Sequence, residues 1–100
     1  MYKAIILPLA KEDVREAAKW YNKRQEGLGK RFTAEVREKV HFIRQNHTAS
    51  NVRYDGVRIA VLNVFPFLVH YSVDENNKTI IVSAVLHTSR DPKIWGERKP

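Results

Sequence analysis

The chain has 100 residues and a mass of 11.7 kDa, which is the size of one domain. Hydrophobic residues make up 43% of it, and it has only four glycines and four prolines, so a disordered or collagen-like chain is excluded. It has no cysteine, which excludes disulfides, iron–sulfur clusters, cysteine-ligated zinc and thiol catalysis. We expect a single domain over residues 1–100.

The charge balance is strongly basic, with 18 Lys and Arg against 11 Asp and Glu and a net charge of +7. This favours a polyanionic partner, namely nucleic acid, a nucleic-acid machine or an acidic protein, over a charge that only maintains solubility. Much of the excess lies in residues 11–46, so we do not expect a single charged patch. No stretch reaches the ~18 apolar residues of a membrane span, and we expect a cytoplasmic protein without a membrane partner.

The first half of the chain reads as one strand and two helices. Residues 2–7 favour a β-strand, which Pro8 closes. From Lys11 the apolar residues recur at helical spacing, with Glu12 and Asp13 expected in the first turn. The segment 27–29, Gly-Leu-Gly, ends this helix, and a second amphipathic helix follows from residue 30. The short break predicts an antiparallel helical hairpin.

The second half reads as strands, because the hydrophobic period becomes two. We expect strands at 57–64, 67–74 and 80–87, with a turn at 75–78 whose Asn residues tolerate positive φ. In the middle strand His70 lies opposite the apolar face, on the less buried side. Short connections predict a three-stranded antiparallel meander. The predicted fold class is therefore α+β, with one layer of helices on one sheet.

Motifs for catalysis are nearly absent. The chain has no Gly-rich phosphate loop, zinc-binding motif or serine elbow, so we expect no metal and no cofactor. His87 ends the last strand and is followed by Arg90, a pair that could act as a general acid and a phosphate ligand. The simpler interpretation is a polar strand end with a surface Arg–Asp pair.

A set of cations and aromatic rings is the best candidate for binding. Cations beside aromatic planes suit nucleic-acid backbones and bases. Trp95 has a second interpretation, as an apolar anchor that fastens the C-terminal tail to the core. The set comprises Arg53, Tyr54, Arg58, His87, Arg90, Lys93 and Trp95.

Three stretches together resemble a known family. They are residues 16–21 with 27–32, residues 53–58 with 65–71, and residues 85–92 followed by Trp95. In this order and spacing they resemble the ParE/RelE superfamily of bacterial toxin–antitoxin toxins, and more closely its ParE, or plasmid-stabilisation, branch. The resemblance covers about residues 2–95. It implies a helical hairpin on an antiparallel sheet, which agrees with the fold derived from the pattern.

The resemblance also implies partners and an activity. A cognate antitoxin, largely helical and acidic, would wrap the toxin. ParE-type toxins act on DNA gyrase, whereas RelE-type toxins cleave mRNA on the ribosome with several Lys and Arg of the middle strands. Here residues 59–64 and 67–73 contain no Lys or Arg, Leu68 stands where the ribonucleases have a basic residue, and no Tyr follows residue 71. Without those cations, charge on a scissile phosphate lacks stabilisation.

We therefore expect a ParE-like toxin that binds its target without catalysis. The residues carried over to its target-facing edge and tail are Arg58, His87, Arg90 and Trp95. One alternative is a RelE-like ribosome-dependent mRNA endonuclease that uses His87, Arg90 and Arg58. The other is a non-toxic member of the family that only binds an antitoxin.

Overall fold

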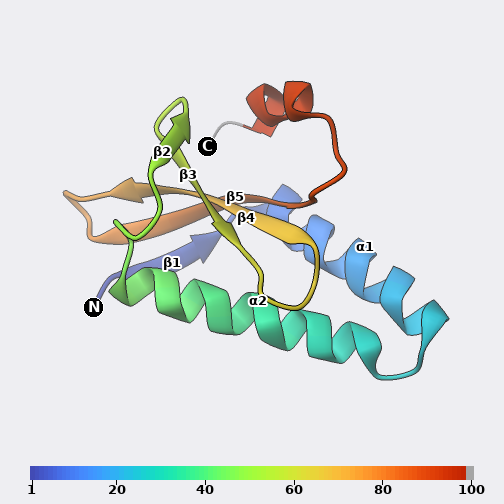
Figure 1. Ribbon diagram of the computed structural model, residues 1–100. Coiled ribbons are helices and arrows are strands. Elements are labelled where there is room, and N and C mark those ends of the chain that lie inside the picture. The colour runs from blue at the N-terminus through green and yellow to red at the C-terminus, as the bar shows by residue number, and fades with distance from the viewer. Residues whose placement is uncertain (99–100) are drawn as a thin grey trace.

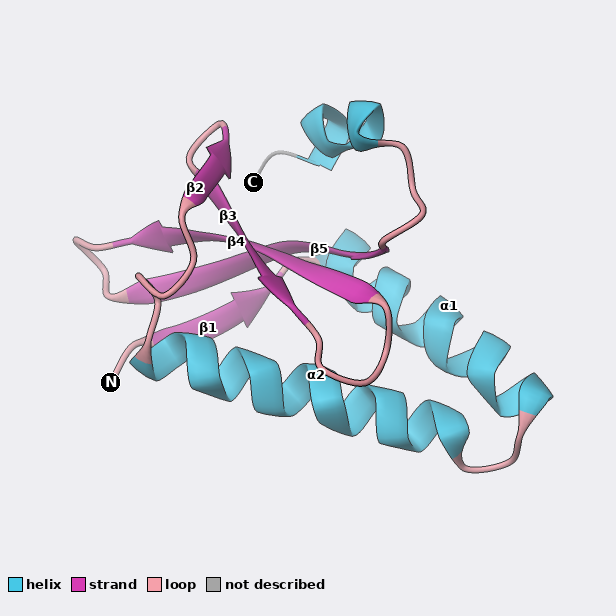
Figure 2. Ribbon diagram, in the orientation of Figure 1, coloured by secondary structure: helices cyan, strands magenta, loops and turns pink. Residues whose placement is uncertain are grey.

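A helical hairpin covers one face of a five-stranded sheet in the computed structural model of the chain, which describes residues 1–98 (Figures 1 and 2). A short 3₁₀ helix, η1, lies over the opposite face near the C-terminus. The predicted α+β class is confirmed. The elements in chain order are β1 (Lys3–Ile6), α1 (Pro8–Arg24), α2 (Leu28–Gln45), β2 (Val52–Tyr54), β3 (Val57–Val61), β4 (Phe67–Asp74), β5 (Thr79–His87) and η1 (Pro92–Arg98).

The sheet has the strand order β1-β5-β4-β3-β2. Strands β2 to β5 form an antiparallel meander, and β1 adds to its edge in parallel with β5. The meander thus has one strand more than the three expected. The extra strand β2 turns into β3 through Asp55 and Gly56, whose φ angles are 43° and 76°. Two consecutive positive φ angles match the twist of a tight hairpin, and Asp-Gly is a preferred sequence for it.

Helix α1 begins at Pro8 and not near Lys11. Proline is well suited to the first helical turn, because that turn needs no N–H donor and the ring fixes φ near the helical value. Glu12 and Asp13 consequently lie in the second turn, and the first turn contains no acidic residue. The expected stabilisation of this helix start by acidic side chains is therefore wrong.

The two helices meet closely at their turn. Gly27 has a left-handed φ of 87°, which glycine adopts without steric cost, but it is the N-cap of α2, whereas the C-cap of α1 is Gln25. At Gly29 a Cβ would lie only 2.2 Å from the carbonyl oxygen of Ala18, so a side chain there would push the helices apart. The Gly29 N–H donates to Oδ1 of Asn22 at 2.8 Å, which fixes the turn.

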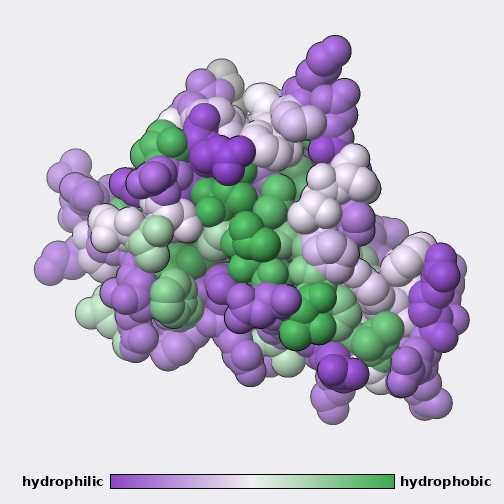
Figure 3. Space-filling model, viewed as in Figure 1, coloured by the Kyte–Doolittle hydropathy of each residue, from purple (hydrophilic) through white to green (hydrophobic). Residues whose placement is uncertain are grey.

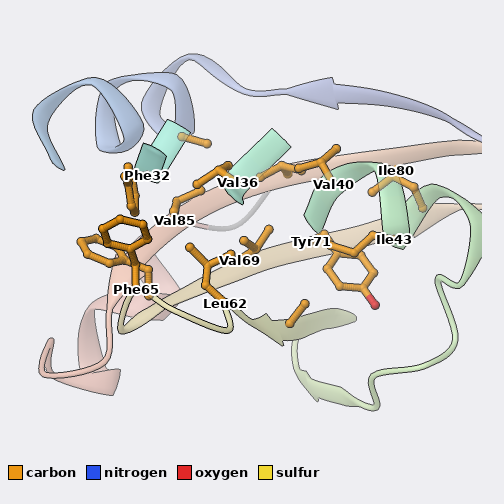
Figure 4. Close-up of a cluster of buried hydrophobic side chains, with 14 residues drawn as sticks. Phe32, Val36, Val40, Ile43, Leu62, Phe65, Val69, Tyr71, Ile80 and Val85 are labelled. Atoms are coloured by element: carbon orange, nitrogen blue, oxygen red, sulfur yellow. The ribbon is translucent and has the colours of Figure 1, made fainter. Parts of the chain in front are cut away.

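The core lies between the hairpin and the sheet (Figure 4). Helix α2 contributes Phe32, Val36, Val40 and Ile43, the residues that share one face in the sequence pattern.

No helix within residues 1–98 is both long and apolar enough to cross a bilayer. In the turn after β4 the residue with positive φ is Lys78, at 47°, and not an asparagine as expected.

Candidate functional site

Arg53, Tyr54 and Trp95 meet on the outer face of the sheet, which is the face turned away from the helical hairpin. The Tyr54 and Trp95 rings are 5.4 Å apart at an interplanar angle of 32°. The Arg53 guanidinium lies 5.8 Å from the centre of the Trp95 ring. The hairpin β2–β3 supplies the first two residues and η1 supplies the third, so part of the set chosen from the sequence does assemble. With His70 below them, we call these residues the outer-face cluster.

His70 lies on the outer face, but it is fully buried, whereas we expected the less buried side. The alternation is as predicted, since Val69 and Tyr71 on either side belong to the core under the hairpin. The difference arises because two other segments cover the ring. Tyr54 approaches it at 5.8 Å and Trp95 at 5.0 Å between ring centres.

The buried imidazole has one bonded and one free nitrogen. Nδ1 lies 2.8 Å from the Tyr54 hydroxyl oxygen, while Nε2 has no partner among the described residues. Burial chiefly, with the nearby charges of Arg98 and Arg53, lowers the pKa of His70 to about 4, and Asp13 opposes this shift. His70 is thus neutral at pH 7, and a group with this pKa is poorly matched to proton transfer near neutrality.

An ion pair fastens η1 over the sheet. The Arg98 guanidinium is paired with the Asp13 carboxylate of α1 and also donates to the carbonyl of Ser83 at 3.2 Å. Ser83 lies at a β-bulge, where the register between β4 and β5 shifts. Asp13 also accepts the Val85 N–H at 3.0 Å. Ser83 is the extra residue at the bulge and Val85 lies beyond the end of β1, so the ion pair satisfies backbone groups that the sheet leaves free there while it holds the C-terminal segment.

His87 and Arg90 lie apart from the outer-face cluster, beside α1. His87 Nδ1 accepts the Ser89 N–H at 3.0 Å, so its proton is on Nε2 when the ring is neutral. Both residues line a hollow of about 380 Å³, together with Trp20. Its other lining residues are Glu12, Asp13, Glu16, Ala17, Phe67, Val85 and Leu86. Of its three carboxylates, Asp13 is paired with Arg98 and Glu12 with Arg15, and Glu16 remains against Arg90, so the hollow offers a phosphate no excess of positive charge.

Arg58 and Lys93 join neither group. The Arg58 guanidinium donates to the carbonyl of Ser50, in the loop that leaves α2. Lys93 is exposed at the start of η1, where its N–H donates to Asp91 at 2.9 Å. The predicted set therefore divides into an outer-face group, a group beside α1, and these two separate positions. Within residues 1–98 no group of His, Asp or Glu is placed to hold a metal ion.

A basic groove beside β1 was missed by the sequence analysis. It has a volume of about 510 Å³ and lies between β1, α1 and α2. Its apolar lining residues are Ala4, Ile6, Val14, Val36 and Val40, and its polar ones are Lys3, Lys11, Thr33, Arg37, His41 and Arg44. Five basic side chains and no carboxylate surround an apolar floor. The sequence signal is present in the cations that flank the apolar helix faces, but only the fold brings β1 beside them.

An apolar surface continues from the outer-face cluster. Val61 of β3 is 57% exposed and pairs with the half-buried Leu68 of β4, and Val64 in the following loop is 71% exposed. Figure 3 shows hydrophobic side chains gathered at the centre of this view, over β3 and β4. The outer face is thus covered at the cluster and open beside it. Exposed apolar patches of this kind are typical of protein interaction sites.

Comparisons with known proteins agree with this architecture. Residues 4–92 match the family model described as the ParE toxin of the type II toxin–antitoxin system parDE. A chain of the chromosomal ParDE system from P. aeruginosa is similar with a TM-score of 0.75 and 18% identity, covering 87% of this chain and 96% of that one. A chain of the intact E. coli RelBE toxin–antitoxin complex is similar with a TM-score of 0.68 and 15% identity, covering 90% of this chain and 100% of that one. A chain of the Mycobacterium tuberculosis RelBE2 toxin–antitoxin complex is similar with a TM-score of 0.59 and 14% identity, covering 86% of this chain and 96% of that one. No curated protein matches the chain.

Proposed function

The chain belongs to the ParE toxin family of type II toxin–antitoxin systems, and on that premise we propose that it is a toxin that binds and inhibits DNA gyrase and that a cognate antitoxin neutralises it. The proposal assigns binding, not bond cleavage, to the outer face of the sheet. The observation that carries it is that the candidate catalytic residues lie at separate places. His87 and Arg90 lie beside α1, whereas Arg58 contacts the loop after α2, so the three do not converge on one phosphate-sized site.

The distances along the sheet support binding over cleavage. Arg58 pairs across β3 and β4 with Tyr71, whereas His87 pairs with Phe67. Four residues along a strand correspond to roughly 13 Å. An RNA phosphate held by Arg58 would therefore be out of reach of His87, and the hollow at His87 is lined by carboxylates. General acid–base catalysis requires the acid within hydrogen-bond reach of its substrate.

The basic groove supports an antitoxin as the partner. An acidic, amphipathic segment would place its apolar side chains on Val36 and Val40 and its carboxylates near Lys3, Lys11 and Arg37. Such complementary charge raises the association rate and selects the partner. The free edge of β1 runs beside the groove, since within residues 1–98 β1 pairs only with β5.

The first experiment is inducible expression in a bacterial host. We expect growth arrest with double-strand breaks and an SOS response, and rescue when the neighbouring gene is co-expressed. Purified protein should inhibit supercoiling by gyrase. Normal growth at high expression would contradict toxicity and favour a member that only binds an antitoxin.

Two further measurements separate the alternatives. Primer extension on translated messages should show no new 5′ ends; cleavage within codons that is lost in His87→Ala would establish the endonuclease instead. Trp95→Ala is expected to reduce toxicity and keep antitoxin binding, whereas Arg37→Glu should weaken antitoxin binding and keep toxicity. If both variants lost both properties equally, the two surfaces would not be separate.

A further inference from the structure

The positive charge of the chain is concentrated at the turn of the helical hairpin. Residues 19–31 contain five cations and one carboxylate, Glu26, which is a net charge of +4 out of +7 for the whole chain. The other 87 residues together carry only +3. The expectation of a dispersed charge therefore needs refinement. The cations are Lys19, Lys23, Arg24, Lys30 and Arg31, and we call these five residues the basic tip.

All five side chains of the basic tip are exposed and available. None makes an ion pair or a side-chain hydrogen bond within residues 1–98, and the one cation–π contact among them is that of Arg24, whose guanidinium lies 4.3 Å from the Trp20 ring centre. In Figure 1 the turn of the hairpin projects at the lower right, beyond the ends of the strands. The basic tip can thus approach a large partner without interference from the sheet.

The hairpin presents these cations on a rigid support. The close approach of Gly29 to the Ala18 carbonyl and the Asn22 hydrogen bond hold the two helices together at the turn. Cations on rigid elements lose less conformational freedom on binding than cations on a flexible tail. The tip is therefore suited to a partner with regularly spaced negative charge.

We propose that the basic tip binds the phosphate backbone of duplex DNA. A protein partner is disfavoured because protein interfaces depend on buried aromatic or apolar anchors. Beside the turn the large exposed apolar side chain is Trp20, which is 52% exposed and has the Arg24 guanidinium against its ring, while Asn22, Gln25 and Glu26 are polar. A single strand is disfavoured because it needs several free aromatic faces, and Trp20 already has Arg24 against its ring. Backbone binding needs only cations, through release of counterions.

This contact is independent of the target of the toxin. Sequence-independent binding of this kind has a dissociation constant of roughly 10⁻⁴–10⁻⁶ M at physiological salt, and each phosphate contact adds about −0.9 to the slope of log K against log salt. With four contacts we expect a slope near −3.6. The binding should therefore be measurable at low salt and weak at high salt.

The test is fluorescence anisotropy of a labelled duplex of mixed sequence with the full-length protein over a salt series. The tip variant carries Lys23→Gln, Arg24→Gln, Lys30→Gln and Arg31→Gln. A control of equal net charge carries Lys3→Gln, Lys11→Gln, Arg37→Gln and Lys93→Gln. We expect the tip variant to lose affinity by tenfold or more and the magnitude of its slope to decrease by about 3.6. The control should change by less than threefold.

Equal losses in the two variants would overturn the proposal, as would tighter binding of a single strand or of polyglutamate than of the duplex. If circular dichroism shows that the tip variant is unfolded, a double variant with Lys23→Gln and Lys30→Gln replaces it. Its control is then the double variant with Lys3→Gln and Lys93→Gln. Antitoxin binding and toxicity are measured on the same variants. The tip variant should keep antitoxin binding, so a failure of the DNA contact is distinguishable from a failure of the proposed function.

Discussion

The Tyr54 hydroxyl oxygen and Nδ1 of His70 lie 2.8 Å apart, in the only side-chain bond that joins β2 to β4 among the described residues. This bond holds a fully buried imidazole whose second nitrogen has no partner. Tyr54 also contacts Trp95, so one tyrosine supports both the strand below and the C-terminal segment above. The surface that we assign to the target thus depends on a polar contact beneath it.

Tyr54→Phe is expected to lower the free energy of unfolding by about 1–3 kcal/mol. The reason is that the change leaves both nitrogens of the buried His70 ring without a partner, and an unsatisfied buried polar group costs about that much. Urea denaturation measures it. Tyr2→Phe is the control, because the Tyr2 hydroxyl makes no hydrogen bond within residues 1–98 and its loss should cost under ~0.5 kcal/mol. Equal effects of the two changes would contradict the role of the bond.

A second prediction concerns pH. The pKa of His70 is lowered to about 4 in the fold, chiefly by burial, while the pKa of an unfolded histidine is about 6.5. The unfolded state therefore binds more protons between these values, and stability falls as the pH falls through that window. The full stabilisation is present above pH ~6.5, and roughly 3 kcal/mol of it should be lost by pH ~4.

Urea denaturation at half-unit steps from pH 7.5 to 4.5 checks this prediction. His70→Leu is the matched variant, since it keeps an apolar side chain below Trp95 and removes the titrating group. It should lose most of the pH dependence in this window. If wild type and His70→Leu showed the same slope, another group would be responsible.

The helical hairpin could be predicted from the sequence because its signals are local. The apolar spacing around Phe32 and Val36 and the glycines of the turn are read within a few residues. The start of α1 was placed too late because the acidic residues were weighted above Pro8, which fixes the first turn by its ring. The strand β2 was missed although Asp55-Gly56 is a hairpin signal, because three residues are too few for a visible alternation.

The site was harder to predict because its contacts join distant residues. Arg98 and Asp13 are 85 positions apart, and nothing in either neighbourhood indicates the other. The buried state of His70 depends on two segments that fold over it from elsewhere in the chain. The basic groove likewise forms only when β1 pairs with β5 in parallel, and the sequence pattern did not place β1 in the sheet. Residue types were thus predicted better than their assembly.

A third prediction tests the close packing of the helices. Gly29→Ala is expected to destabilise the fold by about 1–3 kcal/mol, because the added Cβ would lie 2.2 Å from the Ala18 carbonyl oxygen and the helices would have to separate. Helix propensity alone predicts the opposite sign, since alanine is favoured over glycine by about 1 kcal/mol. Gly96→Ala is the control, because no atom of the part of the chain that the structure describes lies within 4 Å of its added Cβ. Thermal unfolding of the two variants decides between packing and propensity.

A fourth prediction concerns the ion pair that fastens η1. Arg98→Gln should loosen the C-terminal segment, because it removes the donor to Asp13 and Ser83 while Asp13 keeps its bond to Val85. In a Trp20→Phe background, in which Trp95 is the only tryptophan, we expect a red-shifted emission and faster quenching by acrylamide. The loss in the free energy of unfolding should be about 1–2 kcal/mol, since the pair is largely shielded from water.

The control is Arg15→Gln, which breaks an exposed pair with Glu12. It should lower the free energy of unfolding by under ~0.5 kcal/mol and leave the emission unchanged. Unchanged Trp95 emission in Arg98→Gln would show that the aromatic contacts alone hold the segment in place.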